Sequence, residues 1–81
     1  MDTSANDVKS EKLRMLYPVE HVSKPLLYHL ILDFGLVPNI LRARVEHEAG
    51  GQIDVELSGN ADNIERGKKW LEESGIKTTP I

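Results

Sequence analysis

Apolar residues recur at the three- and four-residue spacing of an α-helix between Pro25 and Gly35. Ser23 can cap this helix, and Pro25 suits its first turn because the N–H that proline lacks has no helical partner there. Gly35 supplies the left-handed residue that often ends a helix. The pattern therefore predicts a first helix, whose apolar positions are Leu26, Leu27, Leu30, Ile31 and Phe34.

A second helix is predicted before Gly75, with either Asn60 or Asp62 as its N-cap. Gly67 falls in the middle of it, where a glycine costs about 1 kcal/mol relative to alanine. A glycine at such a position indicates that another helix or the sheet approaches closely. The apolar positions of this second helix are Ile64, Trp70 and Leu71.

Alternating apolar and polar residues predict strands around these helices. A strand that ends at Pro18 precedes the first helix, and a short strand over residues 76–81 follows the second. Two further strands lie between the helices, joined through residues 49–51. The residues expected to face the core are Leu13, Met15 and Tyr17 in the first strand and Ile53, Val55 and Leu57 in the third.

The second strand, residues 37–46, has a polar residue within its apolar series. Its odd-numbered positions are expected to face the core, and they are Val37, Asn39, Leu41, Ala43 and Val45. Because the inward positions of the third strand are also odd-numbered, the hairpin loop must contain an odd number of residues. A three-residue loop meets this condition. It would pair Val45 with Val55, Ala43 with Leu57 and Arg44 with Glu56.

The predicted order of elements, β-α-β-β-α-β, is the ferredoxin-like arrangement. The expected fold is α+β, a two-layer sandwich in which two helices cover one face of a four-stranded antiparallel sheet. The open face is either a solvated surface with two isolated apolar residues or a dimer contact centred on Leu16 and Ile40. Its expected residues are Arg14, Leu16, Ile40, Arg42, Arg44, Asp54, Glu56 and Ser58.

Composition narrows the classes of function. We expect residues 1–10, which are polar and aperiodic, to form a disordered tail, and residues 11–81 to form one domain whose small core would gain from a partner subunit. The absence of cysteine excludes disulfides, cysteine-bound zinc and all-cysteine iron–sulfur clusters. A net charge of −3, with acids and bases interspersed, disfavours nucleic acid. Because no apolar run reaches about 20 residues, we expect a cytoplasmic protein without membrane insertion.

The chain shows no catalytic constellation. His21, His29 and His47 lack the helical i, i+4 spacing of a typical zinc motif. His47 lies between two glutamates and could form a weak metal site or a pH-sensitive site, but a surface histidine at the end of the hairpin is the favoured interpretation. No serine has a nucleophile-elbow context, and no pair of carboxylates lies in an apolar setting. We therefore expect a non-enzymatic protein without metal or cofactor.

Asn39 is the most informative polar residue. An amide on the inward side of a strand must find hydrogen-bond partners. It can bind the backbone of the preceding loop, Gly35 to Pro38, which is a common structural role. Alternatively, it can bind the polar end of a small ligand while neighbouring aliphatic side chains contact the apolar end.

The run Asn39-Ile40-Leu41 resembles the motif that gives the NIL domain its name. The similarity continues in order through residues 55–59, Ile64, residues 70–71 and residues 75–76, and it covers about residues 11–81. The family is ferredoxin-like and ACT-related, and it is best known as the C-terminal regulatory domain of methionine-importing ABC transporter ATPases. In those proteins two domains associate, and methionine binds at or near their interface. Other members are attached to ferredoxin modules, and some stand alone in bacteria.

The resemblance implies that Asn39 contacts the amino-acid group of a ligand and that Ile40 and Leu41, next to Pro38, form the apolar wall. Arg42 and Arg44 could bind a carboxylate or change the ligand altogether. The expected function is a stand-alone, homodimeric, small-ligand-binding regulatory domain, with methionine as the first candidate. The alternative is an adaptor that binds another protein through its open sheet face or an edge strand.

Overall fold

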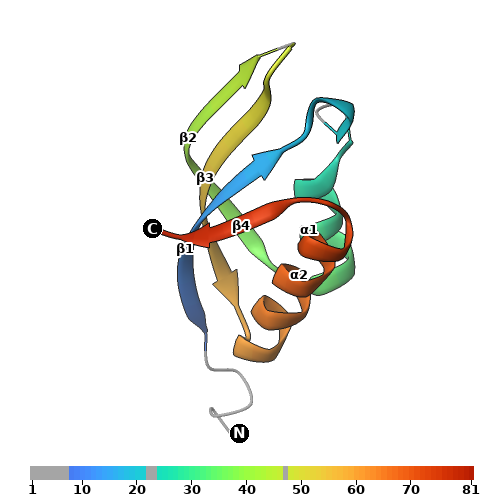
Figure 1. The fold of residues 1–81 in the computed structure, drawn as a ribbon. Helices are drawn as coiled ribbons and strands as arrows, with labels where there is room; N and C mark the ends of the chain where they lie inside the picture. The colour runs from blue at the N-terminus through green and yellow to red at the C-terminus, as the bar shows by residue number, and fades with distance from the viewer. Residues whose placement is uncertain (1–7, 22–23, 47) are drawn as a thin grey trace, which may run out of the picture.

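A computed structural model describes residues 8–21, 24–46 and 48–81 of the chain. Two α-helices pack on one side of a four-stranded antiparallel sheet, which confirms the predicted α+β sandwich (Figure 1). A short 3-10 turn, Val19–His21, follows the first strand. The elements are β1 (Lys9–Tyr17), α1 (Leu26–Phe34), β2 (Val37–Glu46), β3 (Gly50–Gly59), α2 (Ala61–Glu73) and β4 (Lys77–Pro80).

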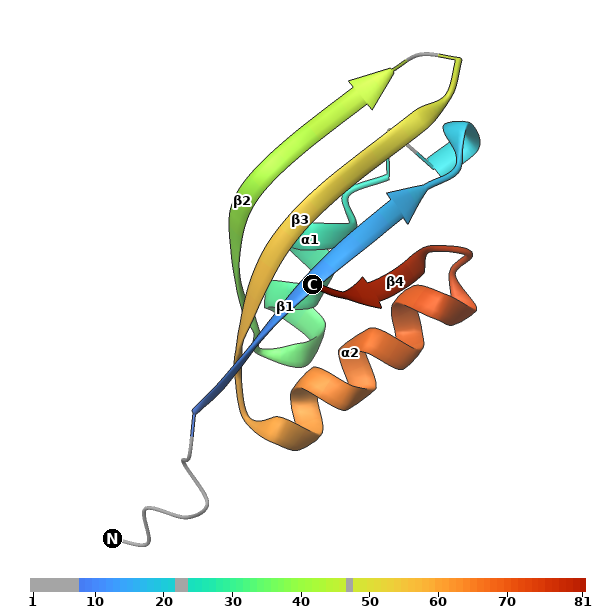
Figure 2. The same cartoon turned by 60° about the vertical axis from the view of Figure 1, so that its left-hand side comes forward.

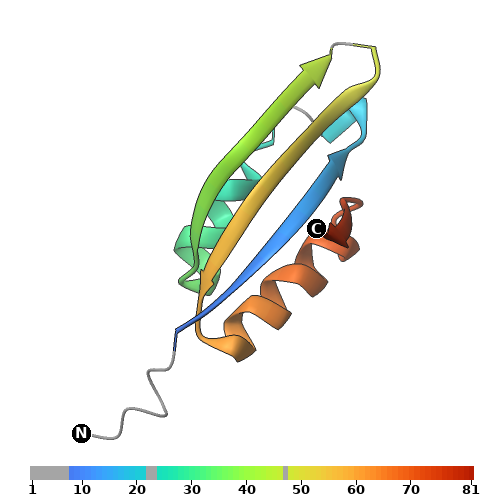
Figure 3. The same ribbon diagram turned by 90° about the vertical axis from the view of Figure 1, so that its left-hand side faces the viewer.

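The sheet order is β2-β3-β1-β4, so β3 and β1 are central and β2 and β4 are the edges (Figure 2). The core lies between the central strands and the helices. The predicted inward residues of β1 and β3 are buried, except that Ile53 is only half-buried. Among the residues that the structure describes, no helix lies on the opposite face of the sheet (Figure 3). The most deeply buried side chains are Leu13, Met15, Leu30, Leu36, Val55, Leu57, Ile64, Leu71 and Ile76.

Both helices begin and end close to where the sequence predicts. Gly35 has a left-handed φ of 65° and its N–H bonds to the Ile31 carbonyl, which ends α1. The Asn60 side chain caps α2 by accepting from the Asp62 N–H at 2.8 Å. Pro25, expected in the first turn of α1, is instead its N-cap and provides no side-chain hydrogen bond, and the proposed cap Ser23 lies outside the described residues.

At Gly67, α2 lies close to Leu30 of α1 and to Leu36, and the sequence had indicated such a close approach. A Cβ added at Gly67 would lie 2.8 Å from a methyl carbon of Leu36 and 3.3 Å from one of Leu30. Leu30 belongs to α1 and Leu36 follows it, so the glycine allows α2 to pack directly against this region. The lower helix propensity of glycine is offset by burial of these leucines.

The first strand is longer than the alternation suggested. Lys9 and Ser10, which the sequence placed in a disordered tail, pair with Gly59 and Ser58 of β3, and the two serine hydroxyls are 2.9 Å apart. Pairing with a central strand orders these polar residues although they contribute nothing to the core. Residues 1–7 lie outside the described part of the chain.

The predicted register of the β2–β3 hairpin is wrong. Glu46 pairs with Gly50, so the connection does contain three residues, but the pairing is displaced. Val45 lies opposite Gly51, not Val55, and Arg44 lies opposite Gln52. The reason is Gly50: it has a φ of 93°, and a side chain there would collide with the Tyr17 carbonyl. The glycines therefore begin a strand that lies tightly against β1, where we had expected them to form the loop.

A bulge at Leu41 also changes which residues of β2 face the helices. The pairing shifts between Ile40, opposite Val55, and Arg42, opposite Asp54, so that Leu41 is an extra residue. Ile40 consequently lies on the helix side of the sheet and Asn39, opposite Glu56, lies on the open side. Both positions are the reverse of the prediction.

Candidate functional site

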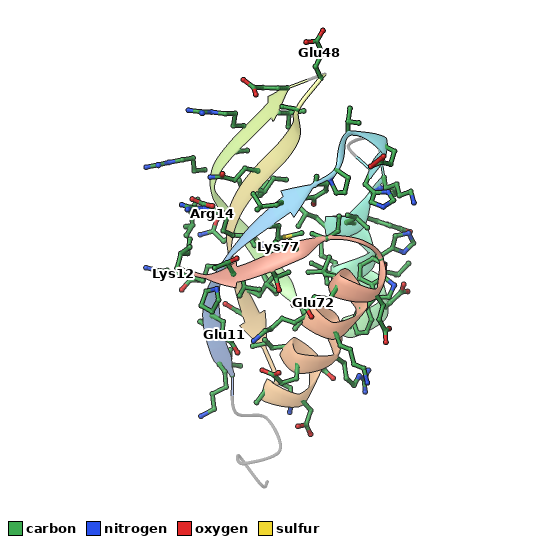
Figure 4. All side chains as sticks on the ribbon, in the orientation of Figure 1. Glu11, Lys12, Arg14, Glu48, Glu72 and Lys77 are labelled. Atoms are coloured by element: carbon green, nitrogen blue, oxygen red, sulfur yellow. The ribbon has the colours of Figure 1, made fainter. Side chains whose placement is uncertain are left out.

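Side chains of all four strands line up across the open face. One row consists of Arg44, Gln52, Leu16 and Lys77, and the next consists of Arg42, Asp54, Arg14 and Thr79. Lys12 and Arg14 point away from the helices (Figure 4). The paired residues of this face include five basic side chains and three acidic ones, whereas the chain as a whole has a net charge of −3. The open face is therefore relatively cationic.

Asp54 forms an ion pair with Arg14 near the centre of this face. It is buried, and its carboxylate accepts two hydrogen bonds from Arg14, at 2.9 and 3.1 Å. These bonds lower the pKa of Asp54, against the opposing effect of burial, and the charge of Arg42 adds to the lowering. The same pair raises the pKa of Arg14. The sequence placed both residues on this face but did not predict the ion pair.

Arg42 and Arg44 lie on the exposed edge strand. Neither makes an ion pair with any residue in the described part of the chain. Their guanidinium groups are therefore available to a carboxylate or another anion.

A shallow cavity of about 220 Å³ lies on the open face beside Arg44, near the end of the hairpin. Arg44 and Glu46 of β2 line one side, and Leu16 of β1 lines another. Sequence reasoning missed this cavity because it assigned the two glycines to the loop. The signal that could have found it is Gly51, which pairs with Tyr17 of β1 and so belongs to the sheet, together with Gly50, which pairs with Glu46 of β2. The full lining is Leu16, Arg44, Glu46, Ala49, Gly50, Gly51 and Gln52.

The structure does not gather the predicted ligand residues into one pocket. Asn39 is exposed on the open face, so the expectation of a buried amide is wrong. Pro38 and Ile40 lie on the helix side, opposite Leu57 and Val55, and Leu41 occupies the bulge. Their role in ligand binding remains a prediction.

The two residues of the predicted dimer contact, Leu16 and Ile40, lie on opposite faces of the sheet. Leu16 lies on the open face of a central strand, whereas Ile40 lies on the helix side of the edge strand. They cannot form one patch on one face of a single copy. His47, considered for a weak metal site, lies outside the described residues.

Exposed apolar side chains nevertheless concentrate on two elements. Among the described residues, seven of the eleven large exposed hydrophobic side chains belong to α1 or β2, which marks this side as a candidate contact surface. They are Tyr28, Ile31 and Leu32 of α1 and Val37, Ile40, Leu41 and Val45 of β2.

Within the described ranges, no helix is long and apolar enough to cross a membrane. The element order and the uncovered sheet face define a small ferredoxin-like α+β domain. A crystal structure of the C-terminal domain of an ABC transporter ATP-binding protein from Enterococcus faecalis shares this fold, with a TM-score of 0.78 and 20% identity. The similarity covers 88% of this chain and 82% of that one.

The chain belongs to the NIL domain family, whose sequence pattern matches residues 11–80. It is also similar to the L-aspartate semialdehyde sulfurtransferase iron-sulfur subunit of Methanocaldococcus jannaschii, with 38% identity over 56 residues. That alignment covers 69% of this chain but only 42% of the relative, so most of the relative lies outside the shared region.

Proposed function

We propose that this chain is a regulatory domain that binds an amino acid, with methionine as the first candidate, at the interface of two copies. Its task would be binding, without a catalytic step of its own. The observation that carries the proposal is Asn39, the first residue of the family motif, exposed on an edge strand. A second copy or a ligand can reach an amide there without disturbing the core.

Three features support the proposal. The family match covers residues 11–80, which is nearly all of the folded part of the chain. The edge strand β2 exposes apolar side chains beside Asn39, and Arg44 offers a cation on the same face as the amide. A cation can bind the carboxylate of an amino acid, an amide can donate to or accept from its polar groups, and aliphatic side chains can contact its apolar side chain. The sequence contains no cysteine that could bind an iron–sulfur cluster of the kind named for the relative.

The test is thermal unfolding with and without amino acids, combined with calorimetric titration. Methionine at a hundred times its Kd should stabilise the fold by about 2.7 kcal/mol. For a domain of this size, this is a rise in Tm of roughly 10 °C or more. Asn39→Ala should remove most of this rise and leave the unliganded Tm nearly unchanged, because the residue is exposed.

Thr79→Ala is the matched control, since Thr79 lies on the same face but at the other edge of the sheet. It should respond to methionine as the wild type does. Absence of heat and of stabilisation with every amino acid at millimolar concentration would refute the proposal. Light scattering that shows a strict monomer at high micromolar concentration, with and without ligand, would refute its dimeric part.

A second candidate function is that of an adaptor for an acidic protein surface, and Arg42 and Arg44 favour it because they are exposed and form no ion pair with another described residue. Under this hypothesis, substitution of either arginine would abolish capture of the partner protein. Asn39→Ala would leave capture unchanged.

A further inference from the structure

One row of side chains crosses the open face of the sheet from edge to edge. Its members, in order across the sheet, are Arg44 of β2, Gln52 of β3, Leu16 of β1 and Lys77 of β4. Neighbouring strands lie about 4.8 Å apart, so roughly 14 Å separate the two ends of the row. A cation therefore stands at each end, with a polar residue and an apolar residue between them.

The cations of this row are available to a partner. Arg44 and Lys77 are both exposed, and neither makes an ion pair with another residue in the part of the chain that the structure describes. Arg42, in the next row on the same strand, is exposed as well. Two cations thus stand at the β2 end of the row and one at the β4 end.

The acids of the open face do not offset these cations. Asp54 binds Arg14, and Glu56 lies directly opposite Lys12 on the neighbouring strand. Of the three acids on the face, this leaves Glu46 beside the row. An anionic partner therefore matches the charge of this face better than a cationic one.

The space between the charged ends can take one apolar side chain. The cavity on the open face is lined by three of the four members of the row, Arg44, Gln52 and Leu16. Leu16 is 36% exposed, and Ala49 and two glycines add uncharged surface. At about 220 Å³ the cavity is smaller than the roughly 300–1,000 Å³ typical of small-molecule pockets. Its size suits a single side chain inserted by a partner.

The length of the row specifies the segment that fits it. In an extended chain each residue advances about 3.3–3.6 Å, so positions i and i+4 lie roughly 14 Å apart. A segment that crosses the strands with carboxylates at i and i+4 therefore reaches both cations. Alternate side chains of an extended chain point to the same side, so position i+2 also faces the sheet. It lies over the middle of the row, beside Leu16 and the cavity.

Two other occupants fit this face less well. Proteins that bind single-stranded nucleic acid stack its bases on aromatic side chains. None of the four aromatic residues of this chain is on the open face, since one is buried in the core and three belong to the helices. A second copy offers no matching segment, because the sequence nowhere has two acids at i and i+4 around an apolar residue at i+2. The aromatic residues are Tyr17, Tyr28, Phe34 and Trp70.

We propose that the open face docks an acidic segment of another protein, in which carboxylates at i and i+4 of an extended chain flank an apolar residue at i+2. The carboxylates would bind Arg44 and Lys77, and Arg42 would add to the attraction at the first end. The apolar side chain would enter the cavity against Leu16. This inference rests on the second candidate function, that of an adaptor, and is independent of amino-acid binding.

The test is an NMR titration of the isotope-labelled protein with the peptide Ser-Glu-Ser-Leu-Ser-Glu-Ser, whose ends are blocked. The amide resonances of Leu16, Gln52 and Gly51 should shift, and their shifts give Kd. The Kd should rise at least roughly threefold between about 50 and 200 mM salt, because salt screens the attraction. Replacing the leucine of the peptide by serine should weaken binding roughly fivefold, since the apolar contact with the cavity is lost.

Charge variants of the protein test each end of the row. Arg44→Gln and Lys77→Gln should each weaken binding roughly fivefold, because each removes one charge-assisted contact. Glu46→Gln should tighten it roughly twofold, since a like charge beside the carboxylate is removed. Lys69→Gln is the matched control, because Lys69 is an exposed cation of α2 in the helix layer. It should change Kd by less than about twofold.

A rearranged peptide separates the spacing from simple charge. Ser-Leu-Ser-Glu-Glu-Ser-Ser has the same composition, but its acids are adjacent and its leucine lies outside them. It cannot reach both ends of the row with the leucine over the cavity, so it should bind at least roughly fivefold more weakly.

The outcomes distinguish failure of the inference from failure of the functions proposed above. Equal binding of both peptides, or a Lys77→Gln protein that binds as the wild type does, would overturn the inferred segment. Capture of a partner protein that depends on Arg42 and Arg44 would still support the adaptor. No binding of either peptide at millimolar concentration would refute the inference. Tighter binding of an oligouridine at the same residues would assign the face to nucleic acid and overturn it too. Methionine titration judges amino-acid binding separately.

Discussion

The two strands of the β2–β3 hairpin have similar alternating sequence patterns, but the side chains of β3 are more deeply buried than those of β2. β3 lies between two neighbouring strands, and its predicted inward residues Val55 and Leu57 are fully buried. In β2, every residue is exposed except Pro38, which is half-buried. Burial on a central strand fixes which residues face the core, because a shift by one position would expose all of them. An edge strand can accept an extra residue such as Leu41 at little cost.

This difference separates residues that maintain the fold from residues available for binding. On β3, even the outward residue Asp54 is buried and engaged with Arg14. On β2, Asn39, Arg42 and Arg44 are exposed and contribute no side chain to the core. The edge strand is therefore where substitutions should alter binding without unfolding the protein.

The largest contrast is expected between two leucines. Leu57→Ala should destabilise the protein by about 2–5 kcal/mol, because Leu57 is fully buried and its truncation leaves a cavity. Leu41→Ala, at the bulge, should change stability by only about 0.5 kcal/mol. Urea unfolding measures both values. Equal losses would show that β2 is held as firmly as β3.

A smaller contrast is expected between the adjacent glycines of β3. Gly50→Ala should cost about 1–3 kcal/mol, because Gly50 has a φ of 93° and its new Cβ would meet the Tyr17 carbonyl. Gly51→Ala should be nearly neutral, within about 0.5 kcal/mol, since its Cβ would have only ordinary contacts, the nearest at 3.5 Å. Thermal unfolding of the two variants provides the measurement. A tolerated Gly50→Ala would contradict the close packing of this strand on β1.

The smallest expected effect concerns pH. Arg14 lowers the pKa of Asp54 in the folded protein, so the pair contributes stability above the ordinary aspartate value of 3.8. That contribution is lost as the pH falls through the lowered value. Asp54→Asn should therefore lose less stability than the wild type between pH 7 and the acid range. Glu46→Gln on β2 should retain the wild-type dependence, and unfolding curves at several pH values would reveal any departure.

Prediction from sequence succeeded where a local signal and burial agreed. Gly35 ends α1 and Gly67 admits a close neighbour, both as predicted, and Asn60 caps α2, which was one of the two caps that the sequence offered. Prediction failed at the hairpin, because Gly50-Gly51 resembles a loop unless its packing against Tyr17 is known. It also failed for Asn39, because a bulge in an edge strand leaves no mark in the alternation.

The sequence by itself determined the order of elements, the family resemblance and the core of the central strands, since these depend on periodicity, caps and motifs along the chain. Only the tertiary structure decided the register of β2, the Arg14–Asp54 pair and the cavity between Arg44 and Leu16. These features join residues from different strands. The register depends on one extra residue at an edge, where local preferences are too weak to specify it.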